Sequence, residues 1–283
     1  MSPTPVVRFA PSPTGLLHLG NAYSALYSFD TARRLGGRFL LRVEDIDQTR
    51  CRPAHEAAML EDLSWLGLVW EQPVRRQSEH MADYAAALEA LTAGGLTYPC
   101  FCTRNQITRE IAAAPTAPHG PDGALYPGTC RDLSPAAGLD KIASGMAYAI
   151  RLDSGRAAAR VGPGLQWNDR QRGPQVLQAG LHGDVVLARK DTPTSYHLAV
   201  TVDDALQGIT LVTRGADLFA ATHVHRLLQA LLHLPTPEYD HHPLLRDDDG
   251  VRLAKRDGAV SLAQWRREGR APAQLRQSLG FCW

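Results

Sequence analysis

A histidine and two glycines border a proline-rich turn near the start of the chain, in the stretch VRFAPSPTGLLHLGNA at 7–22. A short apolar strand precedes the turn and a helical pattern follows it, so His18 and Gly20 fall where the helix begins. Backbone N–H groups and the positive end of a helix dipole bind phosphate at such a position, and glycine lets the phosphate approach closely. The stretch therefore indicates phosphate binding, although a tight turn with a packed histidine explains it better when it is considered alone.

Three of the five cysteines, Cys100, Cys102 and Cys130, lie around one loop. The odd number of cysteines, and the lack of a basic segment leading into an apolar one at the start of the chain, argue against a disulfide framework. Reduced thiols and a metal site are the remaining interpretations, and the clustering favours the metal. Cys51 and Cys282 have no such neighbours, and we expect them to be inert.

Two pairs of histidines invite the same metal interpretation. His223 and His225 lie in an amphipathic helical pattern, and His241 and His242 follow it. Residues two positions apart on a helix point in different directions, so we expect no metal at His223 and His225.

The composition leaves the function open. The 283 residues include 30 basic and 29 acidic side chains, so the net charge of +1 does not predict nucleic-acid binding, which needs a local basic patch. No apolar run reaches about 18 residues, which argues against a membrane span and predicts a cytoplasmic protein. The length fits a catalytic domain that carries a smaller insertion.

The elements that position these residues alternate between strands and helices. A strand at 6–9, a helix at 21–34 and a strand at 39–43 predict a βαβ unit at the start of an α/β fold. The proline- and glycine-rich stretch AAAPTAPHGPDGALYPG marks a loop where an insertion begins. Elsewhere we expect helices at 54–68, at 80–93 and in DLFAATHVHRLLQALLHL, and a basic helical tail at 262–279. Strands are expected near 147–152 and in GDVVLARK. The stretch HLAVTVDDALQGITLVTRG is expected to form a strand, a turn and a second strand.

Four motifs in this order resemble the glutamyl class of class I aminoacyl-tRNA synthetases. PSPTGLLHLGNA is similar to the HIGH signature, with residues 18–21 in its four places, and RLAKR at 252–256 is similar to KMSKS. VEDIDQTR resembles the EDTDxxR block of that class, and VTRGADL resembles its RGxDL block. The resemblance covers roughly residues 6–260. It implies a Rossmann-like parallel sheet with a zinc-bearing insertion, a short helical C-terminal extension and no anticodon-binding domain.

The resemblance divides the chain into four parts. Residues 1–97 would form the first half of the Rossmann catalytic domain, and 98–183 an insertion that resembles an acceptor-binding domain and carries the zinc site. Residues 184–240 would complete the catalytic domain, and 241–283 would hold the KMSKS-like loop and the helical extension. Since 27 residues follow Arg256, we expect no room for the anticodon-binding region of full-length members.

This length favours a short branch of the class, which activates L-glutamate with ATP and transfers it to the modified base queuosine in the anticodon of tRNA(Asp). YHLAVTVDDALQG at 196–208 is similar to the YQLAVVVDDAxQG motif of that branch. The resemblance implies glutamate, ATP with Mg²⁺ and queuosine-bearing tRNA(Asp) as partners of a monomer. Three alternatives stay open: a truncated synthetase that charges a tRNA 3′ end, a HIGH-superfamily nucleotidyltransferase that makes a small-molecule adenylate, and a non-catalytic tRNA-binding remnant.

The resemblance also gives roles to the residues of an amino-acid pocket. Arg8 and Tyr196 would hold the side-chain carboxylate of glutamate, Arg214 its α-carboxylate, and Glu44 with Ser12 its ammonium group. These residue types suit a ligand with two carboxylates and one ammonium.

ATP would lie against His18, Gly20, Asn21 and Lys255. Adenylate formation needs positioning and charge stabilisation rather than a protein nucleophile. His18 and Lys255 are therefore the catalytic candidates, as a donor to the phosphate oxygens and as a counter-charge to the departing pyrophosphate. Ala254 stands where the class usually has serine, which removes a hydroxyl from this loop.

Two further groups complete the predicted site. Cys100, Cys102, Tyr126 and Cys130 form a CxC and YxxxC pattern that resembles the zinc site of the family's insertion. Because all four zinc positions would be filled by the protein, the pattern predicts one structural zinc per chain, with tyrosine as an uncommon oxygen ligand. In the basic tail, phosphate contacts to tRNA are expected from Arg266, Arg267, Arg270 and Arg276.

Overall fold

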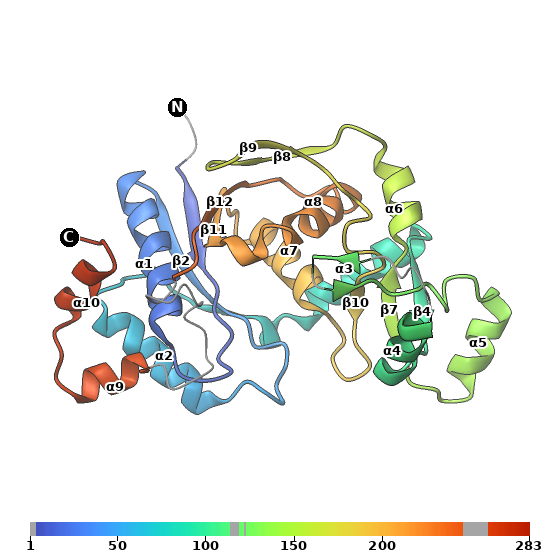
Figure 1. The fold of residues 1–283 in the computed structure, drawn as a ribbon, viewed down its shortest axis with the longest axis horizontal. Helices are drawn as coiled ribbons and strands as arrows, with labels where there is room; N and C mark the ends of the chain where they lie inside the picture. The colour runs from blue at the N-terminus through green and yellow to red at the C-terminus, as the bar shows by residue number, and fades with distance from the viewer. Residues whose placement is uncertain (1–3, 114–118, 122, 246–259) are drawn as a thin grey trace.

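A seven-stranded sheet forms the centre of the molecule in the computed structural model, which describes residues 4–113, 119–121, 123–245 and 260–283 (Figure 1). Its strand order is β3-β2-β1-β11-β12-β8-β9, and every neighbouring pair is parallel except β8 with β9. The strands are β3 (Arg75–Arg76), β2 (Arg38–Val43), β1 (Val6–Phe9), β11 (Leu211–Gly215), β12 (Glu238–His242), β8 (Gln166–Asp169) and β9 (Gly173–Val176). The predicted α/β fold with a largely parallel sheet is confirmed.

The central strands are buried because helices cover the sheet. Val7 and Val43 are fully buried in the strands β1 and β2, as expected where a parallel sheet is covered on both faces. Helix α1 (Leu19–Arg34) packs against β1, β2 and β11, and Leu26 of this helix is completely buried. The helix ends before Gly36, whose φ of +59° is accessible to glycine at little cost.

A smaller antiparallel sheet has the order β10-β7-β4, with β4 at Thr97–Cys100, β7 at Ala149–Leu152 and β10 at Val186–Ala188. Helices α4 (Arg104–Ala113) and α5 (Pro135–Ala143) lie beside this sheet, at the end of the molecule away from both termini (Figure 1). The same region includes α6 (Ser154–Val161) and the short pair β5 (His119–Gly120) and β6 (Gly123–Ala124).

A layer of three helices joins the two sheets. It consists of α3 (Met81–Ala93), α7 (Tyr196–Leu206) and α8 (Ala221–Leu231), which pack through α7. Leu198 and Leu228 are fully buried in this layer and share one apolar core with Leu152 and Leu187 of the smaller sheet. Two 3₁₀ turns, Gln77–Glu79 and Ala216–Leu218, complete the elements of this part of the chain.

Helix α7 differs from the sequence prediction. The stretch HLAVTVDDALQ was expected to begin with a strand because it alternates β-branched and other residues, but it forms a helix capped by Ser195, whose hydroxyl accepts from Leu198 N–H. Seven consecutive residues of the helix, 198–204, are buried. Packing between α3 and α8 therefore outweighs the local preference of Val200 and Val202 for a strand.

The strands also cross the boundaries predicted for the insertion. Residues 166–176 fall within the expected insertion at 98–183, yet β8 and β9 extend the large sheet beside β12. Conversely, β10 falls within the expected second half of the catalytic domain at 184–240 and pairs with β7 of the smaller sheet. Both differences arise because strand pairing joins segments that are distant in the sequence.

The C-terminal extension consists of two short helices, α9 (Leu262–Arg267) and α10 (Pro272–Ser278), rather than one, with α2 (Pro53–Trp65) beside them (Figure 1). Leu262 and Leu275 enter the same apolar core as α1. Among the described residues, no helix is long and apolar enough to cross a membrane.

Candidate active site

A cleft of about 300 Å³ opens at the carboxyl ends of β1 and β11, next to the beginning of α1. Open parallel sheets bind ligands at this position, where neighbouring strands lead to connections on opposite faces. The cleft brings together every amino-acid-site and ATP-site residue that the sequence predicts within the described part of the chain: Arg8, Ser12, His18, Gly20, Asn21, Glu44, Tyr196 and Arg214. Lys255 and Ala254 lie outside the described residues.

His18 is the N-cap of α1. The ring Nδ1 of His18 accepts a hydrogen bond from Gly20 N–H at 3.1 Å, and the backbone N–H of His18 donates to Asn21 Oδ1 at 3.1 Å. Because Nδ1 is an acceptor, the neutral ring carries its proton on Nε2. The reciprocal cap thus orients the imidazole as a donor beside the positive end of the α1 dipole, a suitable arrangement for phosphate.

The proline-rich turn before α1 is anchored by backbone contacts. Glu44 N–H at the end of β2 donates to Pro11 C=O at 3.0 Å, and Thr14 N–H donates to Ser12 C=O at 2.8 Å. The contact with Glu44 holds the turn against the end of β2, and both Ser12 and Glu44 line the cleft.

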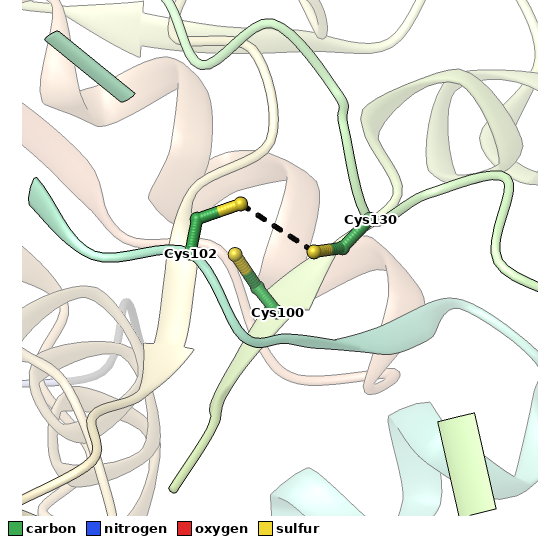
Figure 2. Close-up of side chains that lie close together, drawn as sticks. All are labelled: Cys100, Cys102 and Cys130. Atoms are coloured by element: carbon green, nitrogen blue, oxygen red, sulfur yellow. Dashed lines mark hydrogen bonds between the residues drawn. The ribbon is translucent and has the colours of Figure 1, made fainter. Parts of the chain in front are cut away.

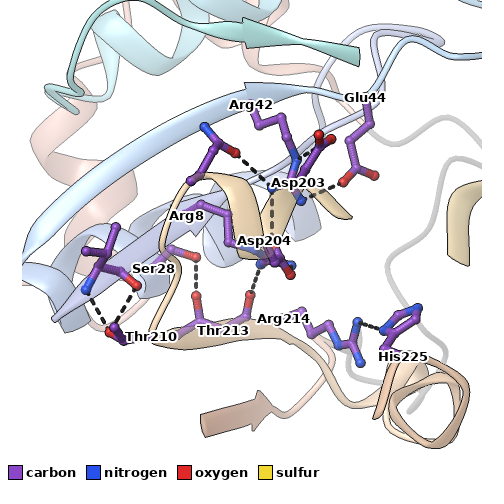
Figure 3. A network of polar contacts seen from close by, with 12 residues as sticks. Arg8, Ser28, Arg42, Glu44, Asp203, Asp204, Thr210, Thr213, Arg214 and His225 are labelled. Carbon is purple, nitrogen blue, oxygen red and sulfur yellow. Dashed lines mark hydrogen bonds and ion pairs between the residues drawn. The ribbon is translucent and has the colours of Figure 1, made fainter. Parts of the chain in front are cut away.

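A network of buried ion pairs holds Arg8 and Glu44, two of the residues that line the cleft (Figure 3). Arg8 donates through Nε and Nη2 to Asp204 at 2.9 and 3.3 Å, and through Nη1 to Thr213 C=O at 3.3 Å. Arg42 donates to Asp204 at 2.8 Å and to Glu44 at 3.1 Å. Each of the two arginines has a carboxylate partner, so neither charge is buried unpaired, and the network orients both Arg8 and Glu44.

The network changes the proton affinity of its carboxyl groups. Burial raises the pKa of Glu44 above its ordinary value, although Arg42 and Arg8 counteract it. Burial acts in the same direction on Asp204, but the charges of Arg8 and Arg42 outweigh it and lower the pKa of that carboxyl. Burial also raises the pKa of the Tyr196 hydroxyl, which therefore keeps its proton and can donate.

Arg214 lies buried on β11 and donates to three neutral side chains. Its Nε donates to His241 Nε2 at 3.1 Å, its Nη1 to His225 Nδ1 at 3.1 Å and its Nη2 to Thr222 Oγ1 at 2.6 Å. Figure 3 shows the contact between Arg214 and His225 of α8. From the sequence, these histidines are candidates for metal binding alone. Their contacts with Arg214 are not predicted, because they join residues 11 and 27 positions apart.

The three clustered cysteines meet at one point, as Figure 2 shows. Their sulfur atoms lie within 4.8 Å of one another, and Cys102 Sγ is 3.5 Å from Cys130 Sγ. The hydroxyl oxygen of Tyr126 is 3.4 Å from Cys100 Sγ and 3.5 Å from Cys102 Sγ. A tetrahedral zinc with bonds of about 2.3 Å to sulfur and about 2.0 Å to oxygen separates its ligands by about 3.5–3.8 Å. The predicted ligands therefore fit a zinc ion.

The surroundings of the cysteines support the same donor set. Cys130 N–H donates to the Tyr126 oxygen at 2.9 Å, and the Arg151 guanidinium stacks 3.9 Å above the Tyr126 ring. Burial acts to raise the pKa of the Cys100 thiol, but hydrogen bonding with Tyr126 and Arg151 outweighs it and lowers that pKa. Burial raises the pKa of Cys102 to about 11. A bound metal cation would stabilise the thiolate form of both Cys100 and Cys102 at neutral pH.

The arginines of the basic tail make contacts within the chain. Arg266 pairs with Glu61 and with the buried Asp62, at 3.3 Å from the latter. Arg276 donates to Leu66 C=O at 3.0 Å, and Arg270 pairs with Glu268 at 2.9 Å. Arg266 and Arg276 thus attach the extension to the catalytic domain. Arg267 is exposed and donates to Ala263 C=O within its own helix. Contacts of these arginines with tRNA phosphates stay a prediction.

Comparison with known proteins places this geometry in a family. The family model of the class I tRNA synthetases (E and Q), catalytic domain, matches residues 5–281. A Glutamyl-Q tRNA(Asp) synthetase of Rhodobacter capsulatus is 49% identical over 98% of this chain and 100% of its own length. A Glutamate--tRNA ligase 2 of Acidithiobacillus ferrooxidans is 39% identical over 96% of this chain and 56% of its own length.

A solved structure shows the same fold. The glutamate tRNA ligase of Elizabethkingia meningosepticum, crystallised in complex with its amino acid, superposes with a TM-score of 0.80 at 28% identity. The alignment covers 98% of this chain and 60% of that structure, so the chain spans less than two thirds of the solved ligase. The chain belongs to the catalytic-domain family of the class I tRNA synthetases (E and Q).

Proposed function

We propose that the protein activates L-glutamate with ATP and transfers the glutamate to queuosine in the anticodon of tRNA(Asp). The observation that carries this proposal is the cleft itself, which combines a helix N-terminus suited to phosphate with two buried arginines, a carboxylate and a tyrosine hydroxyl. The names of the relatives that match nearly the whole chain support glutamate and queuosine as the two partners.

The charges in the cleft suit glutamate. Tyr196 and Arg8 would contact the side-chain carboxylate, Arg214 the α-carboxylate, and Glu44 with Ser12 the ammonium. Burial of Arg8, Glu44 and Arg214 strengthens the charge-assisted hydrogen bonds that they would form, since little water competes for them. Aspartate is one methylene shorter and would not span the two ends of this pocket.

Activation joins the α-carboxylate of glutamate to the α-phosphorus of ATP and expels pyrophosphate. In this step His18 donates from Nε2 to phosphate oxygens that gain negative charge, with Gly20 and Asn21 of the α1 N-terminus beside the nucleotide. Lys255 would neutralise the departing pyrophosphate, and Mg²⁺ would accompany ATP. Transfer then forms an ester between the glutamyl group and a cyclopentene hydroxyl of queuosine and releases AMP.

We further propose that Cys100, Cys102, Cys130 and Tyr126 bind one structural zinc. All four ligand positions would come from the protein, which leaves no open position for catalysis. The ion would hold the end of β4 to the loop at 126–130 and so support the part of the chain predicted to meet the tRNA.

Pyrophosphate exchange tests the activation step. The purified protein should exchange labelled pyrophosphate into ATP with L-glutamate in the absence of tRNA, and aspartate and glutamine should be much weaker. Equal exchange with aspartate or glutamine would contradict the assigned pocket.

The acceptor is tested with three preparations of tRNA(Asp): intact, lacking the 3′-terminal CCA, and lacking queuosine. Labelled glutamate should be transferred to the first two and not to the third. Loss of acceptance on removal of CCA, or equal acceptance without queuosine, would instead identify a synthetase that charges the 3′ end.

A further inference from the structure

Arg214 differs from the other buried arginines near the cleft in what surrounds its charge. Arg8 and Arg42 each contact a carboxylate directly. The three hydrogen-bond partners of Arg214 in the described part of the chain are a hydroxyl and two imidazoles. Its guanidinium has five N–H groups, so this cage of His225, His241 and Thr222 uses three of them.

Each imidazole in the cage has an unprotonated ring nitrogen that accepts a hydrogen bond from Arg214. Asp169 Oδ2 lies 2.6 Å from His241 Nδ1, so Nδ1 carries the proton and Nε2 is free to accept from Arg214. Burial, with the charge of Arg214, lowers the pKa of His241 to about 4. The same causes lower the pKa of His225 well below its ordinary value. Both rings are therefore neutral at physiological pH.

The second imidazole is oriented in the same sense. His225 Nδ1 accepts from Arg214, so its Nε2 donates to His197 Nδ1 at 3.2 Å. Two series of hydrogen bonds begin at the guanidinium: one passes from Arg214 to His241 and Asp169, the other from Arg214 to His225 and His197. In both, each N–H donates in the direction away from Arg214. The first carboxylate along the His241 branch, Asp169, is separated from Arg214 by an imidazole.

We propose that His225, His241 and Asp169 are positioning residues for the amino-acid substrate: they fix the Arg214 guanidinium in the cleft without neutralising it, so that its charge is available to a substrate carboxylate. This inference rests on the proposed function. A carboxylate in direct contact with Arg214 would compete with the substrate for the charge of this guanidinium.

The substitution Asp169→Asn tests this with little change in volume. Asp169 Oδ1 accepts from Gln171 N–H at 3.0 Å and from Arg172 N–H at 2.9 Å, so the amide oxygen of the variant would keep these contacts. Its NH₂ group would then face His241 Nδ1 and move the imidazole proton to Nε2, against the donating Nε of Arg214.

The expected result is a rise of about tenfold in the KM for glutamate during pyrophosphate exchange, since a hydrogen bond to a charged group is lost. The KM for ATP should change less than twofold, because the cage does not contact the nucleotide. Asp240→Asn is the matched control. Asp240 is also buried, neighbours His241 and accepts from Tyr27 and Gln171 instead of the cage, so its variant should keep the wild-type KM for glutamate.

Nitrogen NMR of the histidine rings gives a second readout that a loss of packing would not imitate. The wild-type His241 should show the Nδ1–H tautomer, and the Asp169→Asn variant the Nε2–H tautomer. An unchanged tautomer, or a changed tautomer with an unchanged KM for glutamate, would overturn the inference. If the wild-type protein fails to exchange pyrophosphate with any amino acid, both the proposed function and the inference are contradicted. An unchanged tautomer or an unchanged KM for glutamate in the variant leaves the proposed function intact.

Discussion

Asp204 accepts two hydrogen bonds from Arg8, at 2.9 and 3.3 Å, although the two residues stand 196 positions apart in the sequence. The contact joins helix α7 to strand β1 next to the cleft, which Arg8 lines, and Arg42 of β2 shares the same carboxylate. One side chain therefore holds three elements in the arrangement on which the proposed amino-acid pocket depends.

Replacing Asp204 by Asn should reduce the free energy of unfolding by about 3–5 kcal/mol, because two buried guanidinium groups lose their shared counter-charge. Glu71→Gln is the control, since its ion pair with Arg38 is exposed and should contribute less than about 1 kcal/mol. Urea denaturation measures both variants. Equal effects of the two substitutions would contradict the central role of Asp204.

The contribution of Asp204 should depend on pH. Its pKa is lower in the folded protein than in the unfolded chain, where an aspartate titrates near about 3.9. Its stabilising effect is therefore complete above the unfolded pKa and is lost as the pH falls through the folded pKa. The difference in stability between the wild type and Asp204→Asn should be constant from pH 8 to about pH 5 and shrink in stronger acid; a difference that instead grows in acid would show the opposite sign of the shift.

Elemental analysis of protein purified without added metal or chelator should find one zinc per chain. Tyr126→Phe should bind zinc more weakly because one ligand atom is removed, and Cys100→Ser should lose the zinc. Tyr148→Phe is the matched control, since this tyrosine packs on Phe101 in the same cluster outside the group of sulfur atoms. A metal content near zero in the wild type would contradict the zinc site and support the interpretation of the cysteines as reduced thiols.

His18→Asn separates the cap from the chemistry, because asparagine is a good N-cap but cannot donate from the position of Nε2. We expect unchanged thermal stability and pyrophosphate exchange slowed about 10²-fold, as for the loss of one transition-state donor. Lys255→Ala should slow exchange similarly. Wild-type rates in both variants would refute the roles proposed for the HIGH-like and KMSKS-like motifs.

Arg266→Ala should destabilise the protein by about 1–3 kcal/mol, because it leaves the fully buried Asp62 without its cation. Burial raises the pKa of Asp62, and the hydrogen bond and charge of Arg266 counteract this effect. Arg267→Ala removes an exposed side chain from the same helix and should have little effect on stability. Unfolding in urea distinguishes the two, and similar losses would argue against Arg266 as an anchor.

The sequence by itself determined the features that depend on residues close together in the chain. The strand, turn and capped helix around His18 follow from local backbone preferences, and the CxC and YxxxC spacings indicate a cysteine-rich metal site before any fold is known. The order of the motifs also identified the family and the parallel sheet, because each motif requires a specific strand and helix around it.

Only the tertiary structure decided the features that depend on contacts between distant segments. Packing between α3 and α8 makes residues 196–206 a helix despite their β-branched side chains, and strand pairing carries β8 and β9 out of the expected insertion into the large sheet. The cage of Arg214 draws His225 from α8, His241 from β12 and its orienting Asp169 from β8. No local pattern encodes such contacts, since their energy comes from burial and hydrogen bonding that exist once the chain has folded.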